Sequence, residues 1–189
     1  AYTSISKLLR DAAKRYGSRE ALIFPNNRLN YYDFDQTVDA LAAGFLALGL
    51  DKGDRLGIWS PNRLEWVLTQ FATARIGVLL VNINPAYRLS ELEYSLNTVG
   101  CKAIVLAQSL KSSNYLQMIR TLAPEIDTCR QGKLHSIKLP QLRHVIVMGN
   151  VDGFDGLWSF DDILTLGGPI HKKQLSEIEQ KLKPDDAIN

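Results

Sequence analysis

The chain is poor in the residues that bind metals or form disulfides. Its 189 residues include two cysteines and three histidines. Cys101 and Cys129 lie far apart and have no histidine at metal-ligand spacing, so the sequence predicts neither a zinc site nor a disulfide framework. His135, His144 and His171 are scattered, and we expect each to be a hydrogen-bonded structural residue. This composition suits a reducing, intracellular compartment.

Blocks of one charge sign and long apolar runs are also absent. Lys plus Arg number 22 and Asp plus Glu number 20, which leaves a net charge of only +2. Nucleic acid is therefore not an expected partner. No apolar run is long enough for a transmembrane segment, and residues 1–20 lack the features of a signal peptide. The chain starts at Ala1 instead of methionine, so we expect a processed or cut protein, and any targeting peptide would lie outside this sequence.

Several catalytic signatures are missing as well. The sequence contains no Gly-x-Gly-x-x-Gly after a predicted strand, no Gly-x-x-x-x-Gly-Lys, no Gly-x-Ser-x-Gly and no His-Glu-x-x-His. The acidic pairs Asp161-Asp162 and Asp185-Asp186 fall at a predicted helix start and in a turn, so we interpret them as capping and turn residues. We assign no catalytic, cofactor-binding or metal-binding residue to the chain.

The N-terminal quarter shows two kinds of periodicity. Helical spacing predicts an amphipathic helix that follows Ser4 and ends at Gly17, with solvated basic residues on its other faces, namely Lys7, Arg10, Lys14 and Arg15. Apolar runs at 21–24 and 28–31 flank a turn at 25–27 and predict a hairpin. A longer helical stripe from Phe34 to Leu48 follows, with Asp33 as its expected cap and Gly49 as its end.

Four short apolar runs predict strands that are covered on both faces, at residues 55–59, 78–82, 103–107 and 144–148. Helical patterns separate them. We expect one helix capped by Asn62, one that starts with a capping box at Ser90 and Glu93, and one over 113–122. Parallel strands need such crossovers, so the sequence predicts an α/β fold with three layers, a mostly parallel sheet flanked by helices.

The remaining third of the chain has weaker patterns. The segment 125–141 lacks a clear period and is predicted to be a surface loop. Residues 149–156 are rich in turn formers, residues 160–166 predict a short helix, and Gly167-Gly168-Pro169 ends it.

Several turns resemble the adenylate-forming acyl-CoA synthetase superfamily, which includes fatty acyl-CoA ligases, luciferases and peptide-synthetase adenylation domains. Leu29-Asn30-Tyr31-Tyr32-Asp33-Phe34 is similar to the first core motif of that family, Leu-Thr/Ser-Tyr-x-Glu-Leu, with three conservative departures. Gly53-Asp54-Arg55-Leu56 resembles its Gly-Asp-Arg-Val strand entry, and residues 74–85 resemble its second core motif. Asn82 stands where many members have proline, which together with Asn84-Pro85-Ala86-Tyr87 resembles the medium- and long-chain fatty acyl branch.

The resemblance implies that residues 1–189 are the leading portion of the large N-terminal AMP-binding domain. In this interpretation 1–32 form a helix and hairpin, 33–148 form the α/β core, and 149–189 form an irregular and helical connection toward the phosphate loop. The complete enzyme would join a fatty acid to ATP, release pyrophosphate and pass the acyl group to coenzyme A, with Mg²⁺ at the phosphates. The phosphate loop and the small C-terminal domain would lie beyond Asn189. We therefore expect the chain alone to bind no cofactor, to be inactive and to self-associate.

Few site residues can be transferred from the resemblance. Asn84-Pro85 and Tyr87-Arg88 follow a buried strand, where they either border an acyl or pantetheine tunnel or, as we favour, fix the loop. Arg88 is interpreted as a surface ion-pair residue instead of a ligand for a coenzyme A phosphate. Trp59 and Trp66 are expected to pack in or near the core.

Two other functions stay open. The chain could be a self-contained flavodoxin-like binding module without catalysis, or an adenylation segment that activates an amino acid for a carrier protein. A Thr-Ser-Gly-Thr-Thr-Gly-x-Pro-Lys run just beyond Asn189 would favour the ligase. The expected location is the cytoplasm of a bacterium or the mitochondrial matrix of a eukaryote.

Overall fold

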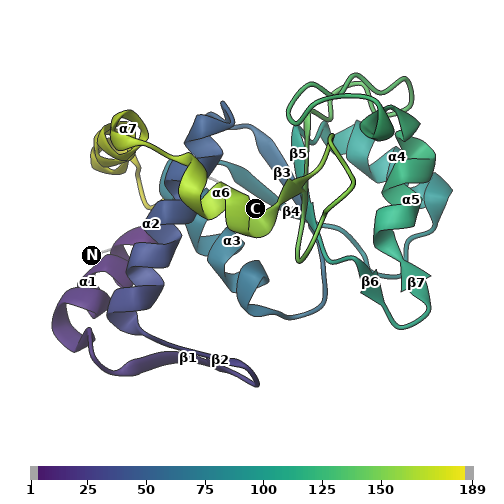
Figure 1. Cartoon of the computed structure of the whole chain (residues 1–189). Helices are drawn as coiled ribbons and strands as arrows, with labels where there is room; N and C mark the ends of the chain where they lie inside the picture. The colour runs from purple at the N-terminus through teal and green to yellow at the C-terminus, as the bar shows by residue number, and fades with distance from the viewer. Residues whose placement is uncertain (1–3, 186–189) are drawn as a thin grey trace. The chain divides into compact units, whose positions relative to one another are not determined.

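The computed structural model describes residues 4–185, and the chain divides into two compact units. The helical unit consists of the described parts of 1–53, 62–79 and 163–188, and the sheet unit contains 54–61 and 80–162. Figure 1 shows both units, with helices and strands alternating along the chain. The predicted α/β class is confirmed.

The helical unit begins with the predicted helix and hairpin. Helix α1 (Ile5–Tyr16) follows Ser4, whose hydroxyl accepts a hydrogen bond of 3.2 Å from the Lys7 amide. Strands β1 (Glu20–Phe24) and β2 (Asn27–Asn30) pair antiparallel. Both predictions for this segment are confirmed.

Helix α2 (Tyr31–Ala47) starts earlier than its hydrophobic stripe indicates. The expected cap, Asp33, is wrong, because Asn30 has the extended backbone of a cap and its side chain accepts a 2.7 Å hydrogen bond from the Asp33 amide. Inside the helix, Gly44 allows close packing, since a Cβ added there would lie 2.0 Å from the Ile163 carbonyl oxygen.

Three further helices belong wholly or partly to this unit. Helix α3 (Leu64–Ile76) ends at Gly77 in the left-handed conformation. Its cap position is Arg63 and not Asn62, because Arg63 is the extended residue directly before the first turn. Helix α6 (Phe160–Leu166) is confirmed, and α7 (Pro169–Lys181), which the sequence patterns did not predict, follows it.

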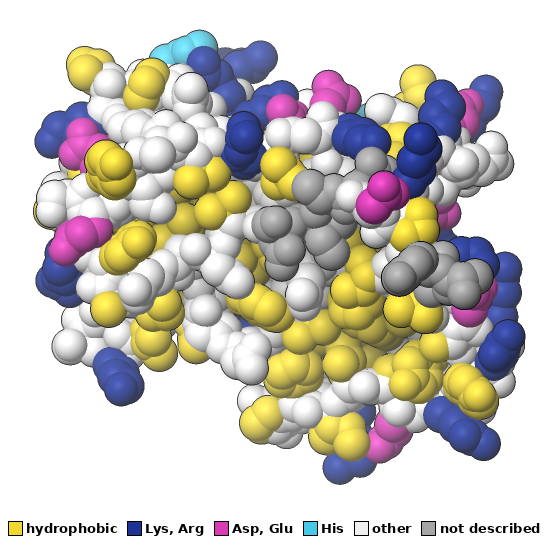
Figure 2. Space-filling view, turned by 180° about the vertical axis from the view of Figure 1, so that it is seen from behind, with side chains coloured by type: hydrophobic (Ala, Val, Ile, Leu, Met, Phe, Trp, Pro, Cys, Tyr) yellow, Lys and Arg dark blue, Asp and Glu magenta, His cyan; other side chains and the backbone are white. Residues whose placement is uncertain are grey.

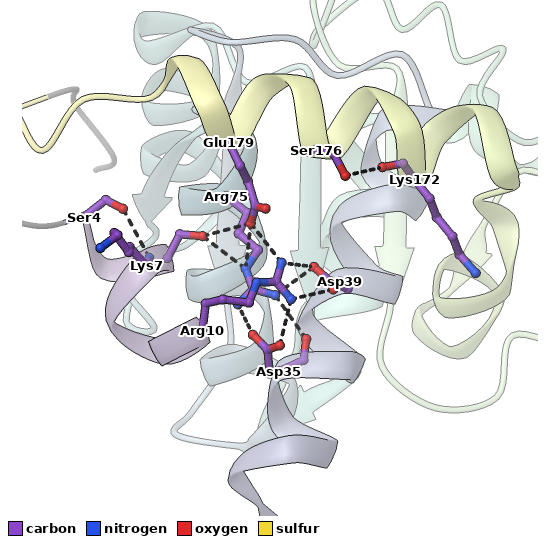
Figure 3. A network of polar contacts seen from close by, with 10 residues as sticks. Ser4, Lys7, Arg10, Asp35, Asp39, Arg75, Lys172, Ser176 and Glu179 are labelled. Carbon is purple, nitrogen blue, oxygen red and sulfur yellow. Dashed lines mark hydrogen bonds and ion pairs between the residues drawn. The ribbon is translucent and has the colours of Figure 1, made fainter. Parts of the chain in front are cut away.

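A buried ionic cluster joins four helices of this unit (Figure 3). The Arg75 side chain of α3 is fully buried. It donates to Ser6 Oγ of α1 at 3.1 Å, and to the Asp35 carbonyl at 3.0 Å and Asp39 Oδ1 at 2.8 Å, both on α2. A second ion pair joins it to the Asp35 carboxylate. Arg75 thereby has acceptors on two neighbouring helices.

Arg10 occupies the other side of the same cluster. It donates to Asp35 Oδ2 at 2.7 Å, to Asp39 through two nitrogens at 2.8 Å each, and to Glu179 Oε1 of α7 at 3.0 Å. The hydrogen bonds to Asp39 and the nearby carboxylates raise the pKa of the Arg10 guanidinium above its already high ordinary value. The prediction that Arg10 belongs to a solvated basic face is therefore wrong, because its partners lie on helices distant in sequence.

The sheet unit is built on five strands in the order β4-β3-β5-β8-β9. These are β3 (Arg55–Trp59), β4 (Leu79–Asn82), β5 (Ala103–Leu106), β8 (His144–Val147) and β9 (Trp158–Ser159). The pairs β3/β5, β5/β8 and β8/β9 are parallel. The four predicted strands are confirmed, whereas β9, with two residues, is too short to give a sequence pattern.

Two helices cross between strands of this sheet. Helix α4 (Leu89–Val99) ends at Gly100 in the left-handed conformation, but the expected capping box is wrong, because Arg88 is the cap position and Ser90 Oγ donates to Glu91 at 3.2 Å. Helix α5 (Tyr115–Leu122) begins two residues late, because 113–114 form β7, which pairs with β6 (Ser109–Leu110). A 3₁₀ turn (Pro124–Asp127) follows α5.

Burial corrects two further expectations. Strand β4 lies at the end of the sheet order, and Leu79 and Val81 are only half-buried, so the prediction of a strand covered on both faces is wrong for β4 within this chain. The segment 125–141 is not entirely a surface loop, because Ile126, Leu134 and Leu139 are buried.

The surface carries charges of both signs between open hydrophobic side chains, as Figure 2 shows for one face. Tyr94 is 74% and Ile137 is 88% exposed in the sheet unit, and Ile170 is 72% exposed in the helical unit. None of the helices within residues 4–185 has the length and apolar character needed to cross a bilayer.

Candidate functional site

The candidate site is the carboxyl edge of the sheet unit, where the parallel strands end together. Trp59 of β3 pairs in register with Leu106 of β5, and Leu106 pairs with Val147 of β8. Ligands of open α/β sheets bind outside the carboxyl ends of the strands. The loops that leave this edge are therefore the candidate ligand-binding region of the sheet unit.

An aromatic pair supports the loop that follows β4. The rings of Trp59 and Tyr115 are stacked, with centroids 3.9 Å apart and an angle of 18° between their planes. Trp59 Nε1 donates to the Asn84 carbonyl at 3.1 Å, and the Tyr115 hydroxyl donates to the Pro85 carbonyl at 3.0 Å. Both side chains are fully buried. The two rings thus hold the backbone of the turn from inside.

The turn itself uses its polar groups internally. The Asn84 side chain accepts from the Ala86 amide at 2.9 Å, and the Asn84 carbonyl accepts from the Tyr87 amide at 3.1 Å. Arg88 donates a long bond of 3.4 Å to the Ser113 hydroxyl. These contacts favour a loop-fixing role for residues 84–88, and whether the turn also borders a ligand stays a prediction. The surface ion pair expected for Arg88 stays a prediction.

The neighbouring loops are arranged in the same way. Ser60 Oγ donates to the Pro61 carbonyl at 2.8 Å, and Gln108 Nε2 donates to the Asn150 carbonyl at 2.9 Å. A serine hydroxyl bonded to a carbonyl has no base to take its proton, so the geometry around Ser60 does not activate a nucleophile.

The titratable groups of the sheet unit also lack the signs of catalysis. Burial raises the pKa of the Tyr115 hydroxyl and of the Cys129 thiol, and raises the pKa of Cys101 to about 11. A reactive cysteine needs the opposite shift. Among residues 4–185 no three His, Cys, Asp or Glu side chains are grouped so as to hold a metal ion.

The other sequence candidates lie on different elements. His135 is exposed, His144 is buried in β8, and His171 accepts a 2.9 Å hydrogen bond from the Gly168 amide at the start of α7. The Asp162 amide is capped by Ser159 Oγ at 3.1 Å, so Asp161 and Asp162 occupy a first helical turn. Asp186 lies outside the described residues. Trp66, on α3, is half-buried, in line with packing near the core.

Sequence reasoning missed the partners of these residues more than the residues themselves. Trp59 was expected in the core, but its stacking on Tyr115 was not predicted, because the two rings come from segments separated by two helices and four strands. The ionic cluster of the helical unit was missed for the same reason. An apolar stripe on α3 that places Arg75 among buried residues is the one signal that pointed to it.

Comparisons with known proteins confirm the family that the motif residues resemble. The chain matches the AMP-binding enzyme family over residues 9–186. It is 41% identical over 189 residues to the mitochondrial medium-chain acyl-CoA ligase ACSF2 of Danio rerio, a match that covers 99% of this chain and 31% of the relative. The ACSF2 of Mus musculus is 44% identical over 169 residues, covering 88% of this chain and 27% of the relative.

A solved structure has a similar fold. The anthranilate CoA ligase AuaEII, in complex with anthranoyl-AMP, aligns with a TM-score of 0.73 at 20% identity, over 88% of this chain and 28% of the ligase. The chain thus spans less than a third of the length of each of these proteins. Because the family match runs over nearly the whole sequence, the chain belongs to the AMP-binding enzymes.

Proposed function

We propose that the chain is the leading part of an ATP-dependent fatty acyl-CoA ligase. The complete protein would convert a carboxylate and ATP to an acyl-adenylate and pyrophosphate, and then transfer the acyl group to the thiol of coenzyme A. The observation that carries the proposal is the 41% identity to a medium-chain acyl-CoA ligase over 99% of this chain. A medium-chain acid is therefore the first substrate to test.

Within this proposal the chain supplies scaffold and not reacting groups. Trp59 and Tyr115 hold the turn at 84–88 at the carboxyl edge of the sheet, where a parallel sheet places its ligand crevice. The division into 1–32, 33–148 and 149–189 within a larger domain belongs to the same proposal. So does the location, a mitochondrial matrix or a bacterial cytoplasm, since the curated relatives of Danio rerio and Mus musculus are named mitochondrial.

The residues described here do not fit ATP and Mg²⁺ by themselves. No cluster of three metal ligands occurs among residues 4–185. In the loops at the carboxyl edge, the Ser60 hydroxyl and the Asn84 side chain form hydrogen bonds to the backbone of their own loops. Stabilising a transferring phosphate needs cations and backbone donors aimed at it. We therefore assign no step of adenylation to a side chain of this segment.

The first experiment measures pyrophosphate release by the 189-residue chain with a medium-chain fatty acid, ATP and Mg²⁺. We expect no turnover and no tight ATP binding, because the sequence has no glycine-rich phosphate signature after any predicted strand. Turnover by this chain would contradict the proposal that it is a catalytically incomplete segment.

The second experiment reads the coding sequence beyond Asn189. A Thr-Ser-Gly-Thr-Thr-Gly-x-Pro-Lys run within a few codons supports the ligase, and a stop codon or an unrelated linker supports a non-catalytic module. If the run is present, thioester formation with fatty acids of increasing length, tested beside amino acids, separates the acyl-CoA ligase from a peptide-synthetase adenylation segment.

A further inference from the structure

Glu179 is the surplus carboxylate of the ionic cluster in the helical unit. The cluster contains two guanidinium groups, those of Arg10 and Arg75, and three carboxylates, those of Asp35, Asp39 and Glu179. Asp35 and Asp39 take the short contacts to both arginines. Glu179 makes the remaining contacts to the two arginines, and these contacts join α7 to the other three helices (Figure 3).

The contacts of Glu179 all use one oxygen, and two of the three are long. Its Oε1 lies 3.0 Å from Arg10 Nη2, 3.6 Å from Arg75 Nε and 3.4 Å from the Ser6 hydroxyl that donates to it. Its side chain is 27% exposed, close to the 25% of Arg10 and the 28% of Asp39, whereas those of Arg75 and Asp35 are 0% and 4% exposed. Partly exposed ion pairs are weaker than buried ones and are screened by salt.

Helix α7 also packs against α2 and α3, with a small apolar face in which Ile178 is half-buried. Leu175 is its buried residue, and Ile170 is 72% exposed. A cavity of about 770 Å³ is lined by Ser4, Ser6 and Lys7 at the start of the chain and by Ser176, Glu179 and Gln180 on α7. Close-packed interfaces leave no such space, so α7 is not closely packed against α1. An element with few buried apolar contacts opens at low free energy.

We propose that α7 is a detachable strap and that Glu179 is the clasp that holds it. The helix leaves its seat as a unit, while α1, α2 and α3 stay joined by the pairs of Arg10 and Arg75 with Asp35 and Asp39. Opening breaks the three contacts of Glu179 Oε1 and exposes Leu175. The inference concerns the folding of the helical unit and stands apart from the proposed ligase activity.

Hydrogen exchange detected by mass spectrometry tests the strap directly. In the unmodified chain we expect amides of α7 to exchange faster than those of α2 and α3. Raising the salt concentration from about 0.05 M to about 1 M is expected to speed exchange of α7 most, because α7 is held through a partly exposed carboxylate, whereas the buried pair of Arg75 with Asp35 joins α2 to α3. Equal protection of α7 and α2 at low salt would overturn the proposal.

Two substitutions on α7 identify the clasp. Glu179→Gln keeps the size of the side chain and removes its charge, so α7 exchange is expected to rise about fivefold, the upper range for a partly exposed ion pair, and to lose its salt dependence. Glu177→Gln is the matched control, since Glu177 is exposed on the same helix. Identical α7 exchange in the two variants would contradict the proposal that Glu179 keeps α7 attached to the other helices.

A fold-loss control keeps the result interpretable. Exchange of α2 and α3 peptides is followed in the same samples, and both are expected to stay protected in Glu179→Gln because that variant leaves Arg75 with Asp35 and Asp39. If α2 and α3 open together with α7, the helices form one cooperative body and the strap proposal fails.

Discussion

Arg75 is the residue whose environment differs most from what its neighbours in sequence indicate. A guanidinium stays charged and has donors in a rigid fork, so its burial requires acceptors on several sides. Ser6, Asp35 and Asp39 provide them from two other helices. The charge is thus stable only when three helices are already in place.

Arg75→Lys is expected to lower the free energy of unfolding by about 2 to 4 kcal/mol, because an ammonium cannot serve all the acceptors of the guanidinium and leaves the buried Asp35 carboxylate with Arg10 as its remaining ion-pair partner among those described. Urea unfolding measures the change. The control is Arg28→Lys, whose pair with Glu20 has side chains 68% and 51% exposed, and whose effect is expected within about 0.5 kcal/mol. Equal effects of the two substitutions would contradict a special role for Arg75.

Cys101 makes stability depend on alkaline pH. Burial raises the pKa of its thiol from 9.0 to about 11. The unfolded chain then loses this proton at lower pH than the folded chain, so the contribution is present below pH 9 and is lost as pH rises toward about 11. The loss amounts to at most about 1.4 kcal/mol per pH unit.

Cys101→Ala provides the comparison. The difference in unfolding free energy between the unmodified chain and this variant is expected to shrink as the pH is raised from 9.0 to about 11. A difference that stays constant with pH would mean that the thiol titrates alike in both states.

At the scale of elements, α2 depends on the absence of a side chain at one position. A methyl group on Gly44 would lie 2.0 Å from the Ile163 carbonyl oxygen and 2.7 Å from its Cγ2. The backbone of the segment at Ile163 would have to move. This close approach explains a glycine inside a long helix, where glycine is otherwise unfavourable.

Gly44→Ala is expected to destabilise the chain by about 1 to 3 kcal/mol net, because overpacking against a backbone atom outweighs the gain of about 1 kcal/mol in helix propensity. Thermal unfolding followed by circular dichroism reports the change. Gln36→Ala, at an exposed position of the same helix, serves as control and is expected to stay within about 0.5 kcal/mol. A stabilised Gly44→Ala chain would rule out the close contact.

The elements differed in how well their sequences predicted them. Strands such as β3 were predictable because a short run of apolar residues that ends at the turn formers Ser60-Pro61 is typical of a buried strand. Caps were not, since Asn30 and Asp33 are equally good capping residues before α2, and α3 has Arg63 at its cap position without a side-chain hydrogen bond. Helix α7 was missed because it buries mainly Leu175 and so has hardly any apolar stripe.

The candidate site was predictable only in part. Asn84 and Pro85 are turn formers after an apolar run, so the turn was expected from local chemistry. Its support by Trp59 and Tyr115 depends on contacts between distant segments. The same limit applies to the pairing of Glu179 with Arg10, since neither residue carries a local sign of its partner.

At the scale of the whole molecule, we expect the chain to self-associate in solution. Strand β4 ends the sheet order with Leu79 and Val81 half-exposed, and Tyr94 and Ile137 add open hydrophobic surface. Open edges and exposed hydrophobic residues favour association. Light scattering at increasing protein concentration is expected to show a rising mean mass, and a constant monomer mass at high concentration would contradict the prediction.

The span of the ionic cluster along the chain has a consequence for folding. Asp35 and Arg75 are 40 residues apart, whereas Ser6 and Glu179 are 173 residues apart. Contacts that close large loops form late and slow the folding of a domain. On a ribosome, the first helix would leave the exit tunnel and meet Asp35 and Arg75 long before residue 179 is synthesised. The order of translation therefore matches an order of assembly in which the last carboxylate arrives at a site that its partners have already built.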